Sequence, residues 1–414
     1  MKNTENSAIK DYSKYCKLII KFGKAAHSFG TPDDRIEQYL HQLSDAFGIE
    51  GDFRSAPKHI MFAFRENDDY WQKMNIATVP GSGFNMTKLA KLDNLVNEIL
   101  SGKLSIEEAD SKLNEFDNIE NTYGNLWIAV SYIFAGVGFA AILSGGWMDI
   151  LFSGILSLLV FFIIWLSQNK GGVLESSIPS STAFAAGFLA IVCKIYIPEL
   201  NYVLVTVSAI ITLIPGYGIS VGIQELVNNN PMSGMGNLIN GLVYLLKQFA
   251  GTWTGFILAD VFFDIPEGVS NSVDPAWRWI FLSLLFFGLV IVFQTSYKDF
   301  FWSFIGCALG YMGVVYGSSL FSSNLGNILG AFAIGAYSNI WERKTGRPGA
   351  IVFLPAMMVL VGGSSGFRGL IAVAQGVPDA QKQFMEMFMI AITITIGLIM
   401  ANTFVKTRPV NLKA

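Results

Sequence analysis

The spacing of hydrophobic residues changes about 120 residues into the chain. Before that point, apolar residues alternate with polar ones at the short periods of amphipathic helices and strands. From Tyr123 onward about ten apolar stretches follow, each close to the ~20 residues that a helix needs to cross a bilayer. They cover residues 124–143, 148–166, 180–198, 202–219, 237–259, 278–295, 300–317, 325–341, 350–363 and 384–405. This pattern predicts an α-helical polytopic membrane protein with about ten transmembrane helices, preceded by a small soluble domain.

The soluble domain, residues 1–120, is predicted to be α+β. Apolar residues recur at helical spacing in 9–29, and a second helix is expected after Thr31, which we interpret as its N-cap. Strand character follows between about 52 and 79, with Ile60, Phe62 and Phe64 on one face. Two more helices complete the domain, one over 85–100 and one that starts with a capping box at Ser105 and Glu108.

Charge and composition support this division. Charged residues make up 14% of the chain, against about 25% in soluble domains. Residues 1–123 hold 34 of the 59 Asp, Glu, Lys and Arg residues. A net charge of −3 provides no basic surface for nucleic acid. The three cysteines and three histidines show no metal-ligand spacing, so we expect no metal, no cofactor and no enzymatic activity.

The distribution of Lys and Arg predicts the orientation in the cell membrane. Residues 1–24 carry charges throughout and show no cleavable signal peptide, so we expect the soluble domain in the cytoplasm. Ten spans then return the C-terminus to the cytoplasm. Inner loops and tail would hold eight Lys and Arg and outer loops three, in line with the positive-inside rule. The longest outer loop, 260–274, contains four acids and no base.

The ten stretches resemble two sets of five, residues 121–275 and 276–414. The fourth stretch of each set ends in a run rich in glycine, LIPGYG at 213–218 and VGGSSG at 361–366. An odd number of spans per set would make the two copies inverted repeats, and interrupted helices at matching positions indicate a transport site. The alternative interpretation is that these glycines only allow helices to pack closely.

Several motifs follow one another in a characteristic order. They are TPDDRIEQYL at 31–40, the strand 60–64, GSGFNMTKL at 81–89, LSIEEA at 104–109, GGWMD at 145–149, Glu175, IPG at 214–216, EL at 225–226 and NIWER at 339–343. Over nearly its full length the chain resembles the threonine/serine exporter family, including the fungal pheromone-regulated membrane proteins. It departs from the family at Gly362-Gly363, where a Leu-Val-Pro-Gly sequence is frequent, and at Asn237, where an arginine is frequent.

Polar residues in the membrane half are the candidates for chemistry, because a charge there requires a partner or a task. Glu175, Glu225 and Lys247 are candidates for proton coupling. Each has an alternative interpretation as a hydrated helix end or a snorkelling side chain. The candidates for substrate binding are Pro215, Gly216, Gly218, Asn237, Asn240, Gly362, Gly363 and Arg368. Arg368 would hold a carboxylate, or it would lie at the membrane boundary.

These observations lead to three hypotheses about function. The resemblance implies a secondary transporter that exports threonine or serine, which we expect to be coupled to proton entry. The phosphate-binding motif GxxxxGK(S/T) does not occur, so ATP is not expected to drive it. A small-dicarboxylate exporter is the alternative that split-chain relatives imply. A non-transporting membrane protein whose soluble head recruits partners is the third. The sequence leaves the oligomeric state open.

Overall fold

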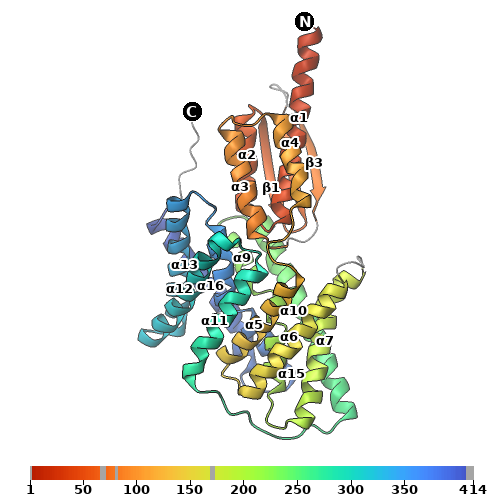
Figure 1. Ribbon diagram of the computed structural model, residues 1–414, viewed down its shortest axis with the longest axis vertical. Helices are drawn as coiled ribbons and strands as arrows, with labels where there is room; N and C mark the ends of the chain where they lie inside the picture. Colours follow the sequence, from red (N-terminus) through yellow and green to blue (C-terminus); the bar gives the residue numbers. More distant parts are fainter. Residues whose placement is uncertain (1, 66–70, 80–82, 168–172, 407–414) are drawn as a thin grey trace.

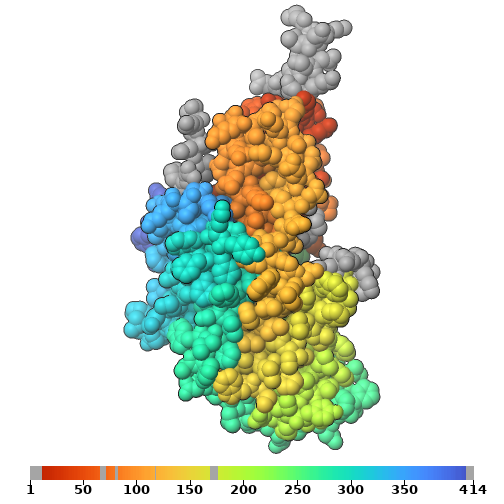
Figure 2. Space-filling view, in the orientation of Figure 1, coloured from red at the N-terminus to blue at the C-terminus, as the bar shows by residue number. Residues whose placement is uncertain are grey.

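A computed structural model describes residues 2–65, 71–79, 83–167 and 173–406 (Figure 1). A head of helices and strands, drawn in red and orange, stands at one end of a larger bundle of helices. Figure 2 shows the surface of the head continuing into the surface of the bundle. The bundle contains the described residues that follow residue 124.

The head is an α+β structure, as predicted. Its three strands form an antiparallel sheet in the order β1-β2-β3, with Phe53 opposite Phe62. Both phenylalanines are fully buried against the helices, together with Phe22, Ile36 and Leu40. The elements are α1 (Lys2–Ser28), α2 (Asp33–Ala46), β1 (Glu50–Ala56), β2 (His59–Arg65), β3 (Gln72–Thr78), α3 (Met86–Leu100), α4 (Ile106–Glu115) and the short 3₁₀ helix η1 (Phe116–Asn118).

Helix boundaries in the head confirm one predicted cap and correct another. The capping box of Ser105 and Glu108 is present at the start of α4. The N-cap of α2 is Pro32, however, and the prediction of Thr31 was wrong. Pro32 has an extended ψ of 144°, so α2 begins at Asp33 and the hydroxyl of Thr31 lies one residue too far away to cap it.

The bundle contains a helix, or a pair of helices, at each of the ten predicted stretches. The unbroken helices are α5 (Asn125–Ile142), α6 (Trp147–Ser167), α7 (Val173–Tyr196), α10 (Pro231–Phe262), α11 (Pro275–Val292), α12 (Tyr297–Leu320), α13 (Ser323–Thr345) and α16 (Ala380–Phe404). The broken ones are α8 (Tyr202–Ala209) with the 3₁₀ helix η2 (Ile211–Leu213) and α9 (Gly216–Val227), and α14 (Ala350–Leu360) with α15 (Gly363–Ala374).

Within the described residues, seven spans are long and apolar enough to cross a membrane, and α8 with α9 makes an eighth if the bent pair is one span. The α14–α15 pair is among the seven. Helices α10 and α13 are 32 and 23 residues long but are less apolar. The protein is therefore a largely helical polytopic membrane protein, and a count of ten crossings remains a prediction.

Residues with positive φ and buried aspartates recur 150 residues apart in the bundle. Four non-glycine residues in the described part of the chain have positive φ, and they form two such pairs at helix ends. A third pair consists of buried aspartates in the first turns of α6 and α12. The pairs are Ser144 with Gln294, Asn229 with Asp379, and Asp149 with Asp299.

Candidate functional site

A chamber of about 1570 Å³ separates the head from part of the bundle. The first turns of α2 line it on the side of the head. The end of α9, the start of α10, the end of α13 and the start of α14 line it on the side of the bundle. Its walls carry both acids and bases, among them Asp34, Glu37, Glu342, Arg35 and Arg343. Asp34 is exposed to the chamber, and reduced hydration between the chamber walls raises the pKa of its carboxyl above the ordinary value.

Two buried carboxyl groups meet beside the chamber, one from the head and one from the bundle. Asp33 of α2 and Glu225 of α9 are 9% and 8% exposed. The Ser233 hydroxyl of α10 lies 2.7 Å from Asp33 Oδ2 and 3.0 Å from Glu225 Oε2. The Asn237 amide donates to Glu225 at 2.8 Å. Ser55 of β1 lies 2.5 Å from the other oxygen of Asp33. Head and bundle thus share one polar cluster.

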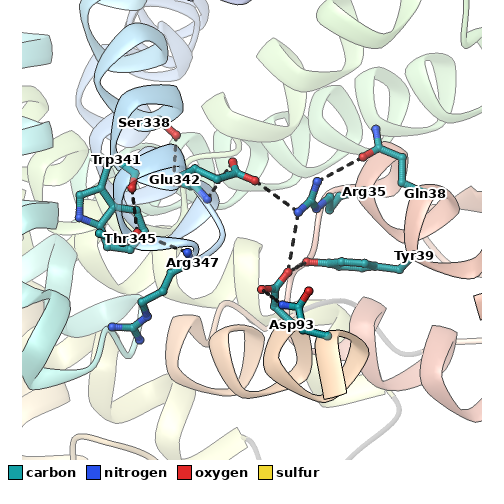
Figure 3. A network of polar contacts seen from close by, with 11 residues as sticks. Arg35, Gln38, Tyr39, Asp93, Ser338, Trp341, Glu342, Thr345 and Arg347 are labelled. Carbon is teal, nitrogen blue, oxygen red and sulfur yellow. Dashed lines mark hydrogen bonds and ion pairs between the residues drawn. The ribbon is translucent and has the colours of Figure 1, made fainter. Parts of the chain in front are cut away.

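Arg35 forms a second bridge between head and bundle (Figure 3). Its guanidinium lies 3.4 Å from Glu342 Oε1 of α13 and 3.7 Å from Asp93 Oδ1 of α3. The Tyr39 hydroxyl donates to the same aspartate, and the Tyr39 ring lies under the guanidinium at 4.8 Å. Burial keeps the pKa of Tyr39 well above its ordinary value, so its hydroxyl stays a donor. Glu342 also accepts the backbone N–H of Gly349.

The head also rests on an apolar seat, next to the chamber-lining Tyr217, whose ring contacts Phe84. The N–H groups of Met86 and Thr87 donate to the carbonyls of Phe293 and Gln294, which follow α11. The Phe84 ring stacks on Phe293 with centroids 4.8 Å apart. The head is therefore attached both by backbone bonds with buried apolar side chains and by an ion pair with polar bonds.

The two helix breaks lie against each other in the bundle. The chain bends by 51° between α8 and α9. Pro215 is the N-cap of α9. A Cβ added to Gly363 would lie 2.6 Å from the Cα of Gly216, closer than real Cβ contacts allow. A Cβ on Gly216 would lie 2.9 Å from the N atom of Gly363. We call this contact of Pro215, Gly216, Gly362 and Gly363 the joint. Helices α9 and α15 both begin there.

The far end of the bundle is held by buried polar caps. Asp149 accepts the N–H groups of Gly146 and Asn201 at 2.9 and 2.7 Å, and it also contacts the Ser270 hydroxyl. The Lys194 ammonium donates to three backbone carbonyls, those of Pro198, Leu200 and Gly268. Both contacts fasten the loop between α10 and α11 across the ends of neighbouring helices.

The other predicted site residues are more scattered. Gly218 is half-buried, and Asn240 and Lys247 are exposed on α10. The Lys247 ammonium lies 3.4 Å from the Ser176 carbonyl. Arg368 is half-buried on α15, and its Nε has no hydrogen-bond partner among the described residues. Glu175 lies in the first turns of α7, but its side chain is outside the described ones.

Sequence reasoning missed four members of the clusters beside the chamber. In the sequence, Asp33 is explained as an acid that complements the helix dipole in a first helical turn. Ser233 is explained as an ordinary helix residue. Arg35 and Glu342 stand within the two motifs at 31–40 and 339–343, but only the fold shows that these motifs meet.

With this geometry in hand, comparison with known proteins identifies the family. A family model for a threonine/serine exporter matches residues 17–259. The chain belongs to the threonine/serine exporter family. A second model, threonine/serine exporter ThrE, matches residues 278–404. The two matches cover both the first and the second half of the bundle, and no solved structure matches the chain.

Fungal proteins are among the relatives of this exporter family member. It is 26% identical over 381 residues to the uncharacterized protein C7D4.12c of Schizosaccharomyces pombe, which covers 88% of this chain and 49% of that protein. It is 23% identical to pheromone-regulated membrane protein 10 of Yarrowia lipolytica over 372 residues, 86% of this chain and 30% of the relative. The chain thus spans half or less of the length of these curated relatives.

Removal of the Arg35 side chain is expected to destabilise the protein. Arg35→Ala leaves two largely buried carboxylates, Asp93 and Glu342, without their cation. The expected cost is ~3 kcal/mol, the low end for a broken buried pair, because the Arg35 side chain is 25% exposed. Thermal unfolding of the purified full chain in detergent measures it. Lys112→Ala is the control: Lys112 and Glu98 are 45% and 42% exposed in their ion pair, so little change is expected.

Proposed function

We propose that the protein is a secondary transporter that exports a small amino acid, threonine or serine, from the cytoplasm in exchange for protons. The observation that carries this proposal is the joint, where two interrupted helices touch through Gly216 and Gly363. Backbone groups freed at such breaks can hold a polar solute inside a membrane protein. Because α9 and α15 both begin at the joint, the positive ends of their dipoles favour the carboxylate of an amino acid.

The proposed bundle consists of two inverted repeats of five helices, residues 121–275 and 276–414, after a head of residues 1–120. The recurrence of special positions 150 residues apart supports this division. The directions of α5 and α11 support an inverted relation between the two repeats. The N–H of Tyr123, just before α5, donates to the side chain of Gln294, just after α11, so the first helix of each set runs opposite to the other. With ten crossings, the head and the C-terminus would lie in the cytoplasm.

The proposed path leads from the chamber under the head, through the joint, to the outer ends of the helices. The chamber presents both signs of charge, which suits a zwitterion. The fastened loop between α10 and α11 would close the outer end in this conformation. Proton coupling would use Glu225, which borders the chamber. Glu175 and Lys247 are the other candidates, and Lys247 reaches the carbonyl next to Glu175.

One observation favours a second candidate function, export of a small dicarboxylate. The Nε of Arg368 is buried without a hydrogen-bond partner among the described residues, in the helix that begins at the joint. An arginine in that state is suited to bind a carboxylate in two-point geometry. A dicarboxylate would use both Arg368 and the helix ends at the joint, whereas an amino acid has one carboxylate for one of them.

Counterflow in proteoliposomes tests the proposal. Vesicles that contain the purified protein are loaded with unlabelled threonine, serine or succinate, and uptake of the same solute in labelled form is followed in each case. We expect rapid exchange of threonine and serine. Exchange of succinate alone would favour the dicarboxylate function. Absence of exchange with every solute, with the protein correctly inserted, would contradict a transport function and favour a partner-recruiting membrane protein.

A further inference from the structure

The cluster of Asp33, Ser233 and Glu225 contains one hydrogen too few for the contacts it makes. One oxygen of each carboxyl group lies within 3.0 Å of the same Ser233 hydroxyl oxygen. A serine hydroxyl has a single hydrogen, so it can donate to only one of the two. The second contact is a hydrogen bond only if the other carboxyl carries a proton and donates it to the serine oxygen. The geometry therefore fits a pair that holds one proton between its two carboxyl groups.

The remaining partners of the two carboxyls fit a pair with one proton. Asn237 Nδ2 donates to Glu225 at 2.8 Å and lies 3.5 Å from Asp33 Oδ2, and the Ser55 hydroxyl contacts Asp33. These are neutral donors, and neither carboxyl has an ion-pair partner among the described residues. Two negative charges held together without a cation would repel each other, which favours retention of the proton.

The charged and titratable groups that face the pair do not replace this proton. From α1 comes His27, whose pKa burial lowers, so that it is neutral at physiological pH. From α2 come Asp34 and Glu37, and from α9 comes Tyr217. Arg54 of β1 is engaged by Glu37. The residues of α10 that contact the pair, Ser233 and Asn237, are neutral.

We propose that Asp33 of the soluble head is the second half of the coupling site, and that the transported proton is shared between Asp33 and Glu225 through Ser233. This inference rests on the proposed function. With the proton present, the pair binds α2 to the start of α10. When the proton leaves to the cytoplasm, two carboxylates face each other without a cation, and this contact between head and bundle weakens. The apolar seat at Phe293 continues to hold the head on the bundle.

The proposed repeat gives an independent reason why a titratable acid, Glu225, lies only at the end of the bundle next to the head. The residue 150 positions after Glu225 is Gln375, which donates to the Tyr202 hydroxyl at the other end of the bundle. An amide cannot release a proton. If the repeats are inverted, the inner end carries a titratable pair and the outer end a neutral hydrogen bond, which gives the two faces different responses to pH.

Infrared difference spectroscopy of the full-length protein in lipid tests the shared proton without reference to transport. At neutral pH the wild type should show the C=O stretching band of a protonated carboxyl. The band should be lost in Asp33→Asn and equally in Glu225→Gln, because each leaves a single carboxyl with neutral donors. Asp45→Asn, an exposed acid of the same helix, is the control and should keep the band. A band that survives Asp33→Asn overturns the proposal.

Transport then tests the role of the pair. In proteoliposomes where the wild type exchanges threonine, Asp33→Asn should lose pH-driven export and retain counterflow. The double variant with Glu225→Gln should lose nothing more, because both changes remove one shared proton. Wild-type pH-driven export in Asp33→Asn overturns the proposal. If the wild type itself exchanges no solute, the proposed function fails, while the infrared result still decides whether the proton is shared.

Discussion

Substitution of Gly363 by alanine is expected to abolish transport, whereas Gly218→Ala is expected to leave it near the wild-type rate. The added methyl group at residue 363 would lie 2.6 Å from the Cα and 2.8 Å from the N of Gly216. These are backbone atoms that cannot rotate away, so the two broken helices must move apart. Overpacking of this kind costs ~1–3 kcal/mol, and here it acts on the proposed substrate path.

Gly218 provides a matched control for this prediction. It lies in the same helix, α9, two residues after the joint, but the nearest atom to an added Cβ is the Asn237 carbonyl at 3.9 Å. Threonine counterflow at equal amounts of membrane-inserted protein measures both variants. A wild-type rate for Gly363→Ala would show that the joint is a packing contact outside the transport path.

The second large effect is expected for Glu225→Gln. A proton carrier must change its charge between the two aqueous sides, and glutamine keeps the shape and hydrogen bonding of the acid while it remains neutral. The contacts with Ser233 and Asn237 can therefore persist. Export driven by a pH gradient should stop, and threonine exchange should continue, because exchange needs no net proton movement.

Inverted membrane vesicles with an imposed pH gradient distinguish these two activities. Uptake of labelled threonine is followed for the wild type and Glu225→Gln, with counterflow as the measure of intact protein. If Glu225→Gln retains gradient-driven uptake at the wild-type rate, Glu225 is not the proton carrier and is a buried helix-end acid. Loss of both activities would indicate misfolding, which thermal unfolding of the purified variant in detergent detects.

Local features of the fold could be predicted because their signals are local. Apolar stretches located the helices of the bundle, and the sequence around Ser105 predicted a capping box that is present. The runs LIPGYG and VGGSSG predicted two interruptions, which occur at Pro215 and Gly362. Proline and glycine act on their own backbone, so neighbouring residues suffice to interpret them. The first residue of α10 was missed because the helix extends beyond its apolar part to the chamber.

The sites could not be predicted in the same way, because they depend on contacts between distant segments. Asp33 and Ser233 lie 200 residues apart in the chain. An aspartate in a first helical turn is explained by the helix dipole alone, and nothing near it in sequence indicates a carboxyl partner. Lys247 illustrates the converse. A lysine inside an apolar stretch suggests a task, yet its exposed side chain contacts a backbone carbonyl.

Protection of a single cysteine next to the joint tests the central claim most directly. Gly218→Cys places a thiol on α9 where the surroundings leave room for a side chain. In an otherwise cysteine-free protein, its reaction with a small thiol reagent is timed with and without threonine, and Ser272→Cys, exposed in the loop before α11, serves as the control. The account predicts that threonine slows the reaction at residue 218 and not at residue 272. Equal rates at residue 218 with and without saturating threonine, in a protein that exchanges threonine, would contradict a path through the joint.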